Sequence, residues 1–313
     1  MKRPFWIVGL LLVCAGLVLF GILMYRSIFT DKEDMQVIGE QKTFSAAELK
    51  SIQINSVSAD IEATSYDGDQ VQVELKGKAN RHVTLWTEEK GSSLRIEVKE
   101  KSRSFLSFFN FSGEGLTLIV KIPERSFESL SIESVSGEQL LSGLYADEVK
   151  VETVSGDIDL EKSTGVLTIK SVSGEQHLAA LQGDSLSAET TSGDVELSGS
   201  ELAKGKVKTV SGEVKLKEVT GEFQVKTTSG DVNLGLLAMN PAKVETVSGE
   251  IEIRIPKESS FEVQGETVTG SIHVKTENFQ FEDSSKGNYK GKAGNGDALL
   301  KLATVSGDIQ VSE

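Results

Sequence analysis

The chain has 313 residues, enough for two ordinary domains, and carries a formal charge of −14. An acidic surface repels phosphate backbones, so we exclude nucleic-acid binding. The 30 glycines, 4 prolines and 6% aromatic residues favour short strands joined by tight turns over a helical protein. Cys14 is the only cysteine, which excludes an intrachain disulfide.

The N-terminus predicts a membrane anchor. Segment 5–25 contains no charged residue and is long enough to cross a hydrocarbon core of about 30 Å as a helix. Lys2 and Arg3 precede it, and positive charges stay on the cytoplasmic side of a membrane. We therefore expect residues 1–26 to form a cytoplasmic tip and one transmembrane helix. The rest of this single-pass cell-membrane protein would be extracellular.

Two other interpretations of this segment are a cleaved signal peptide and a lipoprotein anchored through Cys14. A signal peptide has an apolar run of about 7–15 residues followed by an Ala-x-Ala-like site. The run here is longer, and no such site follows it. Val13 stands where a lipoprotein has a small residue before its cysteine. An uncleaved anchor fits the residues best.

The next two segments lead from the membrane to a repeat. Residues 27–43 are polar and of mixed charge, which predicts a stalk. Residues 44–125 contain several alternating apolar and polar segments separated by turn residues, and we expect an irregular β region that forms an N-terminal cap. Its first segment, 51–63, is a degenerate copy of the repeat, with Ala59 in the position of the repeat glycine.

The motif Val-Ser-Gly-Asp and its close variants recur nine times from Val135 onward. The motif glycines are separated by 19, 18, 19, 19, 18, 19 and 21 residues, and then by 37. A fixed period of this size is typical of solenoid and propeller architectures. The motif glycines are Gly137, Gly156, Gly174, Gly193, Gly212, Gly230, Gly249, Gly270 and Gly307.

Positions seven and five before each glycine, and two and four after it, are mostly aliphatic, with polar residues between them. This alternation predicts two strands per unit with one buried face. The position three before the glycine is always serine or threonine, and we expect this ladder to point inward and to form hydrogen bonds between units. A second corner is expected about nine residues after the first, at Gly165, Gly183 and Gly221.

We therefore predict an all-β fold, a single-stranded, β-helix-like β-solenoid of about 18–19 residues per coil over residues 126–313. A β-propeller is the structural alternative, but its blades need about 40 residues each. The double-length step before Gly307 is interpreted as one coil without the motif, carrying a longer loop at 283–296.

The residue after the glycine is acidic in eight of the nine units, and these residues form the candidate binding ladder. Carboxylates stacked about 4.8 Å apart repel one another. Turn amides and nearby lysines would compensate this repulsion. Alternatively, the ladder would bind divalent cations or a polycationic envelope polymer. The ladder residues are Glu138, Asp157, Glu175, Asp194, Glu213, Asp231, Glu250 and Asp308.

Nothing in the sequence forms a catalytic set, although polysaccharide-cleaving enzymes occur on β-helices. Catalytic acids are expected at single positions that break a repeat, whereas these acids follow its register. The histidines His82, His177 and His273 are far apart in sequence, and no phosphate-binding loop is present. We expect no enzyme activity, no cofactor and no metal, with a polysaccharide-active enzyme as the alternative.

The most apolar stretch after residue 26 lies between two expected strands, at 105–111. A loop there would ordinarily be polar. We expect a cap over the open end of the solenoid, with a membrane-dipping tip or a partner-binding patch as alternatives. Its apolar residues are Phe105, Leu106, Phe108, Phe109 and Phe111.

Four features carry a resemblance to a known family: the N-terminal anchor, Val-x-Ile-Pro at 120–123, a similar segment at 253–256 and the terminal motif at 304–309. Through these features the chain resembles the bacterial putative-adhesin domain family of unknown function. Within that family the chain is similar to the LiaG-like, membrane-anchored members of Gram-positive bacteria. The resemblance covers residues 44–313. It implies an adhesin-like surface module for binding, scaffolding or sensing that is linked to envelope stress, with cell-wall polymers or envelope membrane proteins as partners, but supplies no functional residues.

Overall fold

The computed structural model describes residues 36–79, 83–100, 114–283 and 287–313. These residues form strands, turns and bends, so the all-β prediction is confirmed for them. Within the same ranges no helix has the length and hydropathy of a membrane span. The predicted anchor at 1–26, the apolar stretch at 105–111 and His82 lie outside the described residues.

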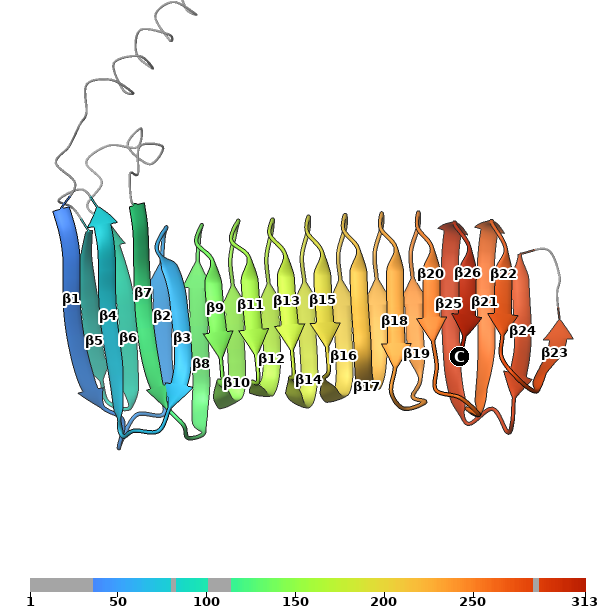
Figure 1. Ribbon diagram of the computed structural model, residues 1–313, viewed down its shortest axis with the longest axis horizontal. Coiled ribbons are helices and arrows are strands. Elements are labelled where there is room, and N and C mark those ends of the chain that lie inside the picture. Colours follow the sequence, from blue (N-terminus) through green and yellow to red (C-terminus); the bar gives the residue numbers. More distant parts are fainter. Residues whose placement is uncertain (1–35, 80–82, 101–113, 284–286) are drawn as a thin grey trace, which may run out of the picture.

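The strands stack into an elongated solenoid with two faces, which we name face A and face B after their sheets (Figure 1). The strands of sheet A are β1 (Gln36–Ser45), β3 (Asp60–Tyr66), β4 (Gln70–Ala79), β7 (Glu114–Pro123), β9 (Gln139–Ser142), β11 (Ile158–Glu161), β13 (Gln176–Ala179), β15 (Val195–Ser198), β18 (Val232–Leu236), β20 (Ile251–Arg254), β22 (Ile272–Lys275) and β26 (Ile309–Ser312).

The strands of sheet B are β2 (Ser51–Ser56), β5 (Val83–Lys90), β6 (Ser93–Glu100), β8 (Phe127–Ser134), β10 (Tyr145–Glu152), β12 (Thr164–Lys170), β14 (Gln182–Glu189), β16 (Glu201–Lys208), β19 (Ala242–Glu245), β21 (Phe261–Thr269), β23 (Phe279–Asp283), β24 (Asn288–Ala293) and β25 (Ala298–Ser306). The long strand β17 (Val214–Lys226) bends around the second corner and contributes to both sheets. Each coil thus has one strand in each sheet.

Parallel pairing places equal repeat positions beside each other. In sheet B, Val149 of β10 pairs with Leu167 of β12, and in sheet A, Leu160 of β11 pairs with Leu178 of β13. The aliphatic residues of these ladders are buried, with exposed fractions of 0–1% for these four side chains. The predicted solenoid and its inward positions are confirmed. Burial of each such side chain contributes about 1.5–3 kcal/mol before entropy is subtracted.

The corner glycines are required by the close stacking of coils. Gly193 has φ of +145°, and a Cβ there would collide with the carbonyl oxygen of Gly174 in the preceding coil. The same collision recurs along the stack, at Gly230 with Gly212 for example. Each such Cβ would point toward the preceding coil. In the degenerate first coil, β2–β3, Ala59 stands in the glycine position, and a Cβ at Gly137 of the next coil would collide with the Ala59 carbonyl oxygen.

The N-terminal end departs from the regular array. The coil β2–β3 stacks on β8–β9, and β6 and β7 continue the two sheets on its other side. β4, β1 and β5 then add in antiparallel orientation. Residues 36–43, expected in the stalk, therefore form most of β1. The regular stack begins at residue 51, within the segment expected to be irregular.

The C-terminal end corrects the interpretation of the double-length step. β25 and β26 are the last strands in sequence, yet they lie between β19–β20 and β21–β22 (Figure 1). Segment 279–293 is not a coil without the motif. It forms an antiparallel hairpin, β23–β24, whose second strand pairs with β21. Phe279 of the hairpin stacks between Phe261 and Tyr289, and this aromatic packing favours an end cover over another coil.

Candidate functional site

The acidic ladder runs along the first corner in strict alternation of aspartate and glutamate. The spatial order of coils is the reason, because Asp308 follows Glu250 in the stack although Ser271 follows it in the sequence. Asp60 of the degenerate coil extends the alternation at the other end. In spatial order the ladder reads Asp60, Glu138, Asp157, Glu175, Asp194, Glu213, Asp231, Glu250, Asp308 and Ser271.

The aspartates bind the backbone of the next coil. Asp157 Oδ1 accepts a hydrogen bond from the Glu175 N–H at 2.8 Å, and Asp194 Oδ1 accepts one from the Glu213 N–H at 2.7 Å. The same bond recurs at Asp60, Asp231 and Asp308. The bond from the Ser271 N–H lowers the pKa of Asp308. The expected compensation by turn amides is therefore found at the aspartates, and it assigns them a structural role.

The ladder glutamates are free of that role. Their side chains are one methylene longer and recur on every second coil, about 9–10 Å apart, which weakens their mutual repulsion. Glu213 pairs with Lys215 at 2.6 Å. Within the described part of the chain, Glu138 and Glu250 form no ion pair and their side chains form no hydrogen bond. These carboxylates are available to a partner.

The serine and threonine ladder beneath the corner is buried, as predicted. Thr153 Oγ1 and Ser134 Oγ are 3.0 Å apart, and Ser171 Oγ donates to Thr190 Oγ1 at 2.9 Å. Later threonines instead bond to carbonyl oxygens of the glycine ladder. The ladder is a packing feature of the core and not a binding surface.

Two coils carry a buried glutamine where the other coils have isoleucine or valine. Gln139 and Gln176 have exposed fractions of 0%, and each side-chain amide donates to a ladder serine at 3.0 Å. Both of these coils have serine three before the glycine, whereas the other motif coils have threonine. The glutamine thus fills the space left by the missing threonine methyl. Sequence reading missed this pairing, although the two substitutions occur together in the sequence.

Faces A and B differ in charge. Along face B, the outward residues Glu133, Glu152, Glu189 and Glu245 each pair with a lysine, in chains such as Glu133–Lys150–Glu152 (3.0 Å each). The hydrogen bonds that Lys150 donates to Glu152 and Glu133 raise its pKa. Face A carries the acidic ladder together with Glu62, Asp159, Glu161, Glu196 and Glu252. Its lysines and arginines between β3 and β22 in the stack are Lys215, Lys217, Arg254 and Lys275.

The three cations nearest the middle of face A already have partners. Lys215 pairs with Glu213, Lys217 pairs with Glu196 at 2.7 Å, and Arg254 pairs with Glu252 at 2.9 Å. The remaining carboxylates give face A a net negative charge. Exposed pairs of this kind contribute only about 0–1 kcal/mol each, so the arrangement is a surface property and not a source of stability.

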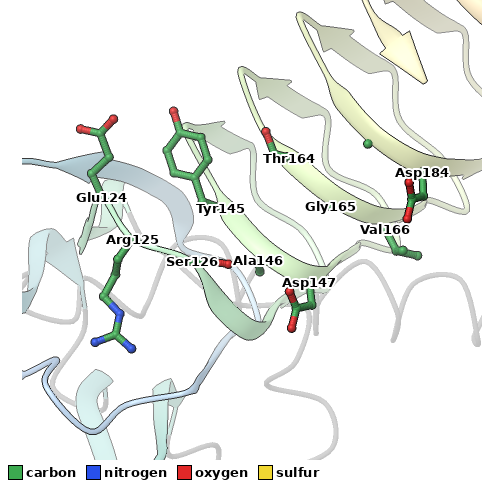
Figure 2. Close-up of a pocket in the computed structure, with 11 residues that line it drawn as sticks. Glu124, Arg125, Ser126, Tyr145, Ala146, Asp147, Thr164, Gly165, Val166 and Asp184 are labelled. Carbon is green, nitrogen blue, oxygen red and sulfur yellow. The ribbon is translucent and has the colours of Figure 1, made fainter. Parts of the chain in front are cut away.

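A shallow groove lies along the second corner of the first regular coils, with a volume of about 760 Å³ (Figure 2). Tyr145 and Thr164 line one part of it, and the carboxylates of Asp147 and Asp184 point the other way. Arg125 is held by the carbonyl oxygens of Ala46 and Leu49, at 2.7 and 2.9 Å. The lining groups diverge, so the groove has no set of side chains aimed at one ligand.

The described histidines, His177 and His273, lie far apart in the stack. His177 Nδ1 lies 3.2 Å from Asp159 and its Nε2 lies 3.7 Å from Glu175. His273 lies near the other end of the stack. No group of three or more histidine, cysteine or acidic side chains could hold a metal ion among the described residues. The positions of Phe105 and the other apolar residues of 105–111 lie outside the described residues.

The two-faced stack of short parallel coils defines a β-solenoid repeat protein. The chain belongs to the Toastrack DUF4097 family, whose family model matches residues 49–312. The comparison with curated proteins finds no match.

Several solved structures are similar in fold. A putative adhesin from Parabacteroides distasonis has a TM-score of 0.51 and 13% identity, over 89% of this chain and 98% of that chain. A putative lipid binding protein from the same organism has a TM-score of 0.50 and 15% identity, over 88% and 97%. A putative adhesin from Parabacteroides merdae has 13% identity over 88% and 97%, with a TM-score of 0.46. At these identities the first two likenesses show the fold alone.

Proposed function

We propose that the chain is a membrane-anchored, extracellular, adhesin-like β-solenoid that serves as a binding and scaffold module of the bacterial cell envelope. The observation that carries a binding role is the difference between the two faces. The outward glutamates in the middle of face B pair with lysines, whereas face A holds carboxylates, such as Glu138 and Glu250, that have no cationic partner among the described residues. A row of such carboxylates on a rigid repeat fits a cationic envelope polymer or a basic protein surface.

Three further observations support the location. The uncharged run at 5–25 follows two basic residues, which favours an anchor with the solenoid outside. The family and the adhesin names of the similar structures fit a surface protein. The resemblance to LiaG-like proteins links the module to envelope stress in Gram-positive bacteria. We expect no catalytic activity, because the acids of face A recur in the register of the repeat, whereas catalytic acids would stand at single positions that interrupt it.

The topology can be tested with the single cysteine. Cys14 lies within the expected membrane span, so a membrane-impermeant maleimide should not label the natural chain in intact cells. Ser198→Cys, on face A, should be labelled in intact cells, and Lys2→Cys only after lysis. Labelling of Ser198→Cys that also requires lysis would contradict an extracellular solenoid.

The binding role can be tested by sedimentation of the full chain, in detergent micelles, with isolated cell walls. The variant Glu175→Gln/Glu213→Gln/Glu250→Gln removes three charges from face A without touching an aspartate that binds the next coil. We expect at least a tenfold loss of affinity. The matched variant Glu152→Gln/Glu189→Gln/Glu245→Gln on face B should bind as the natural chain does. Equal losses in the two variants, or no loss in the first, would refute binding through face A.

A further inference from the structure

The two ends of the solenoid differ in how they treat their free strand edges. At the N-terminal end, β1 and β5 are joined by side chains. Lys42 Nζ donates to the Leu85 carbonyl oxygen at 2.8 Å, and Glu40 Oε2 accepts from the Leu85 N–H at 3.3 Å. The backbone N–H and carbonyl oxygen of Leu85, on the edge strand β5, are therefore occupied, and side chains of this kind oppose strand addition.

At the C-terminal end, the described strands cover the edge of sheet B and leave the edge of sheet A open. In sheet B, β24 pairs with the edge of β21. In sheet A, β22 pairs only with β26 among the described strands. The Ile251 N–H donates to the Asp308 carbonyl oxygen, and the Ile309 N–H donates to that of Ser271, both at 2.9 Å. By the same pattern the Ile272 N–H points away from β26, toward the open edge. Two residues on, the Val274 N–H points the same way.

The side chains of β22 are also incompletely covered. Ile272 and Val274 occupy the ladder positions that are fully buried at Ile309 and Val311 (0%), yet both are only partly buried. The Thr276 hydroxyl, just after β22, is buried without a hydrogen-bond partner in the described part of the chain. One more strand with aliphatic residues at alternate positions would cover Ile272 and Val274 and extend the two aliphatic ladders to which they belong.

The outward positions of β22 select the charge of that strand. Every other motif coil has an acid directly after its glycine, but this coil has Ser271. The next outward residues are His273 and Lys275, so the end coil carries no carboxylate at its outward face A positions. If a strand with acidic outward residues lay beside β22, its carboxylates would meet the cation of Lys275 and the hydrogen-bond donors of Ser271 and His273. An outward lysine there would meet like charge.

We propose that β22 is a strand-addition site for an extended segment of a partner protein in which aliphatic and acidic residues alternate. Backbone hydrogen bonds to the open edge would supply affinity, and the aliphatic and cationic positions of β22 would supply specificity. The sheet already accepts a strand out of sequence order, because β26 lies between β20 and β22. This site is separate from the carboxylates of face A and does not depend on them.

The chain itself provides a suitable probe. Residues 155–161, Ser-Gly-Asp-Ile-Asp-Leu-Glu, place acids opposite Ser271, His273 and Lys275 when aligned in the register of the stack. A fluorescent peptide of this sequence, titrated into the full chain in detergent micelles and followed by anisotropy, should bind saturably and more weakly at high salt. The peptide Ser-Gly-Asp-Asp-Ile-Leu-Glu has the same composition without the alternation and should bind at least tenfold more weakly. Equal binding of the two peptides would overturn the proposal.

Two variants locate the site. Val274→Pro removes an N–H that faces the open edge, a place where proline is tolerated, and should reduce peptide binding at least tenfold. Lys275→Glu leaves the backbone intact and should reduce binding severalfold and abolish its salt dependence. The control, Val268→Ser, alters a side chain on β21, in sheet B, that is 79% exposed. It should leave peptide binding unchanged. Peptide binding that survives both Val274→Pro and Lys275→Glu would refute the site.

A second copy of the chain is the other candidate for the open edge of β22. Sedimentation velocity distinguishes it from a partner segment. The proposal expects one species across the protein concentration range when no peptide is added. A dimer that Val274→Pro abolishes, together with no binding of the alternating peptide, would overturn the proposal and assign the edge to self-association.

Discussion

Faces A and B are built by the same coils, yet they handle charge in opposite ways. On face B, glutamates and lysines of adjacent coils pair, as Glu133 does with Lys150 at 3.0 Å. On face A, aspartates bond to the backbone of the next coil, while the glutamates that alternate with them form no such bond. The comparison shows that the repeat dictates the core and the corners but leaves the outward positions free. Each face can therefore serve a different purpose on one backbone.

The largest effect is expected from a substitution at the glycine corner, which the coils of both faces share. Gly193→Ala places a Cβ against the carbonyl oxygen of Gly174 at a φ of +145°, so the two coils cannot stack at their normal distance. We expect a loss of more than about 3 kcal/mol in the free energy of unfolding, measured by urea denaturation. Gly39→Ala is the control, because no atom lies within 4 Å of the added Cβ. Equal stability of the two variants would show that the corner contact is not required.

The second prediction separates the two kinds of acid on face A. Asp194→Ala removes the acceptor of the Glu213 N–H, bonded at 2.7 Å, and should cost about 1–2 kcal/mol in unfolding free energy. Glu175→Ala on the neighbouring coil removes a carboxylate that holds no backbone amide and should cost less than about 0.5 kcal/mol. If both variants lose the same stability, the structural assignment of the aspartates is wrong.

The third prediction concerns the buried side chains of the two sheets. Among the described residues, glutamines are buried in sheet A, at Gln139 and Gln176, and not in sheet B. The double variant Ser171→Thr/Gln176→Val restores the residues found in most coils and removes the Gln176 carbonyl oxygen, which lacks a partner among the described residues. We expect a gain of about 1 kcal/mol in thermal or urea unfolding. A loss of stability would show that the amide contributes more than its unpaired oxygen costs.

The smallest effect is expected for the ion pairs of face B. The hydrogen bond from Lys243 lowers the pKa of Glu245 from its usual range. The pair should therefore stabilise the fold above the carboxyl pKa of the unfolded chain, and this contribution should vanish as the pH falls through the lower folded value. A double-mutant cycle of Lys243→Ala and Glu245→Ala should give a coupling of about 0.2–0.5 kcal/mol at pH 7. A coupling that persists at pH 2 or in 1 M salt would contradict an electrostatic origin.

Most of the fold follows from periodicity. The aliphatic positions, the inward threonines and the first corner could be located because every coil repeats them. The second corner was only partly predictable, since Lys162, Ala180 and Glu218 adopt positive φ there, a conformation expected of glycine.

The end coils could not be predicted in the same way. A linear repeat says which segments resemble one another, but it does not give their order in space. The alternation of aspartate and glutamate could have indicated it, because Asp308 continues the pattern after Glu250 whereas Ser271 breaks it. For the candidate site, the acidic residues could be named from sequence, but their division into structural and available groups depends on side-chain length and needed the stack.

The inserted coil has a consequence for how the protein is made. β25 and β26 follow the hairpin in the sequence, yet they separate β19–β20 from β21–β22. A nascent chain can stack its coils one by one up to β20, but β21–β22 have no place to dock until β25 and β26 have been synthesised. Loss of residues 298–313 would therefore take a coil out of the interior of the stack instead of shortening it. The emergence of β25 and β26, and not of the last motif before the hairpin, determines when the stack can be completed.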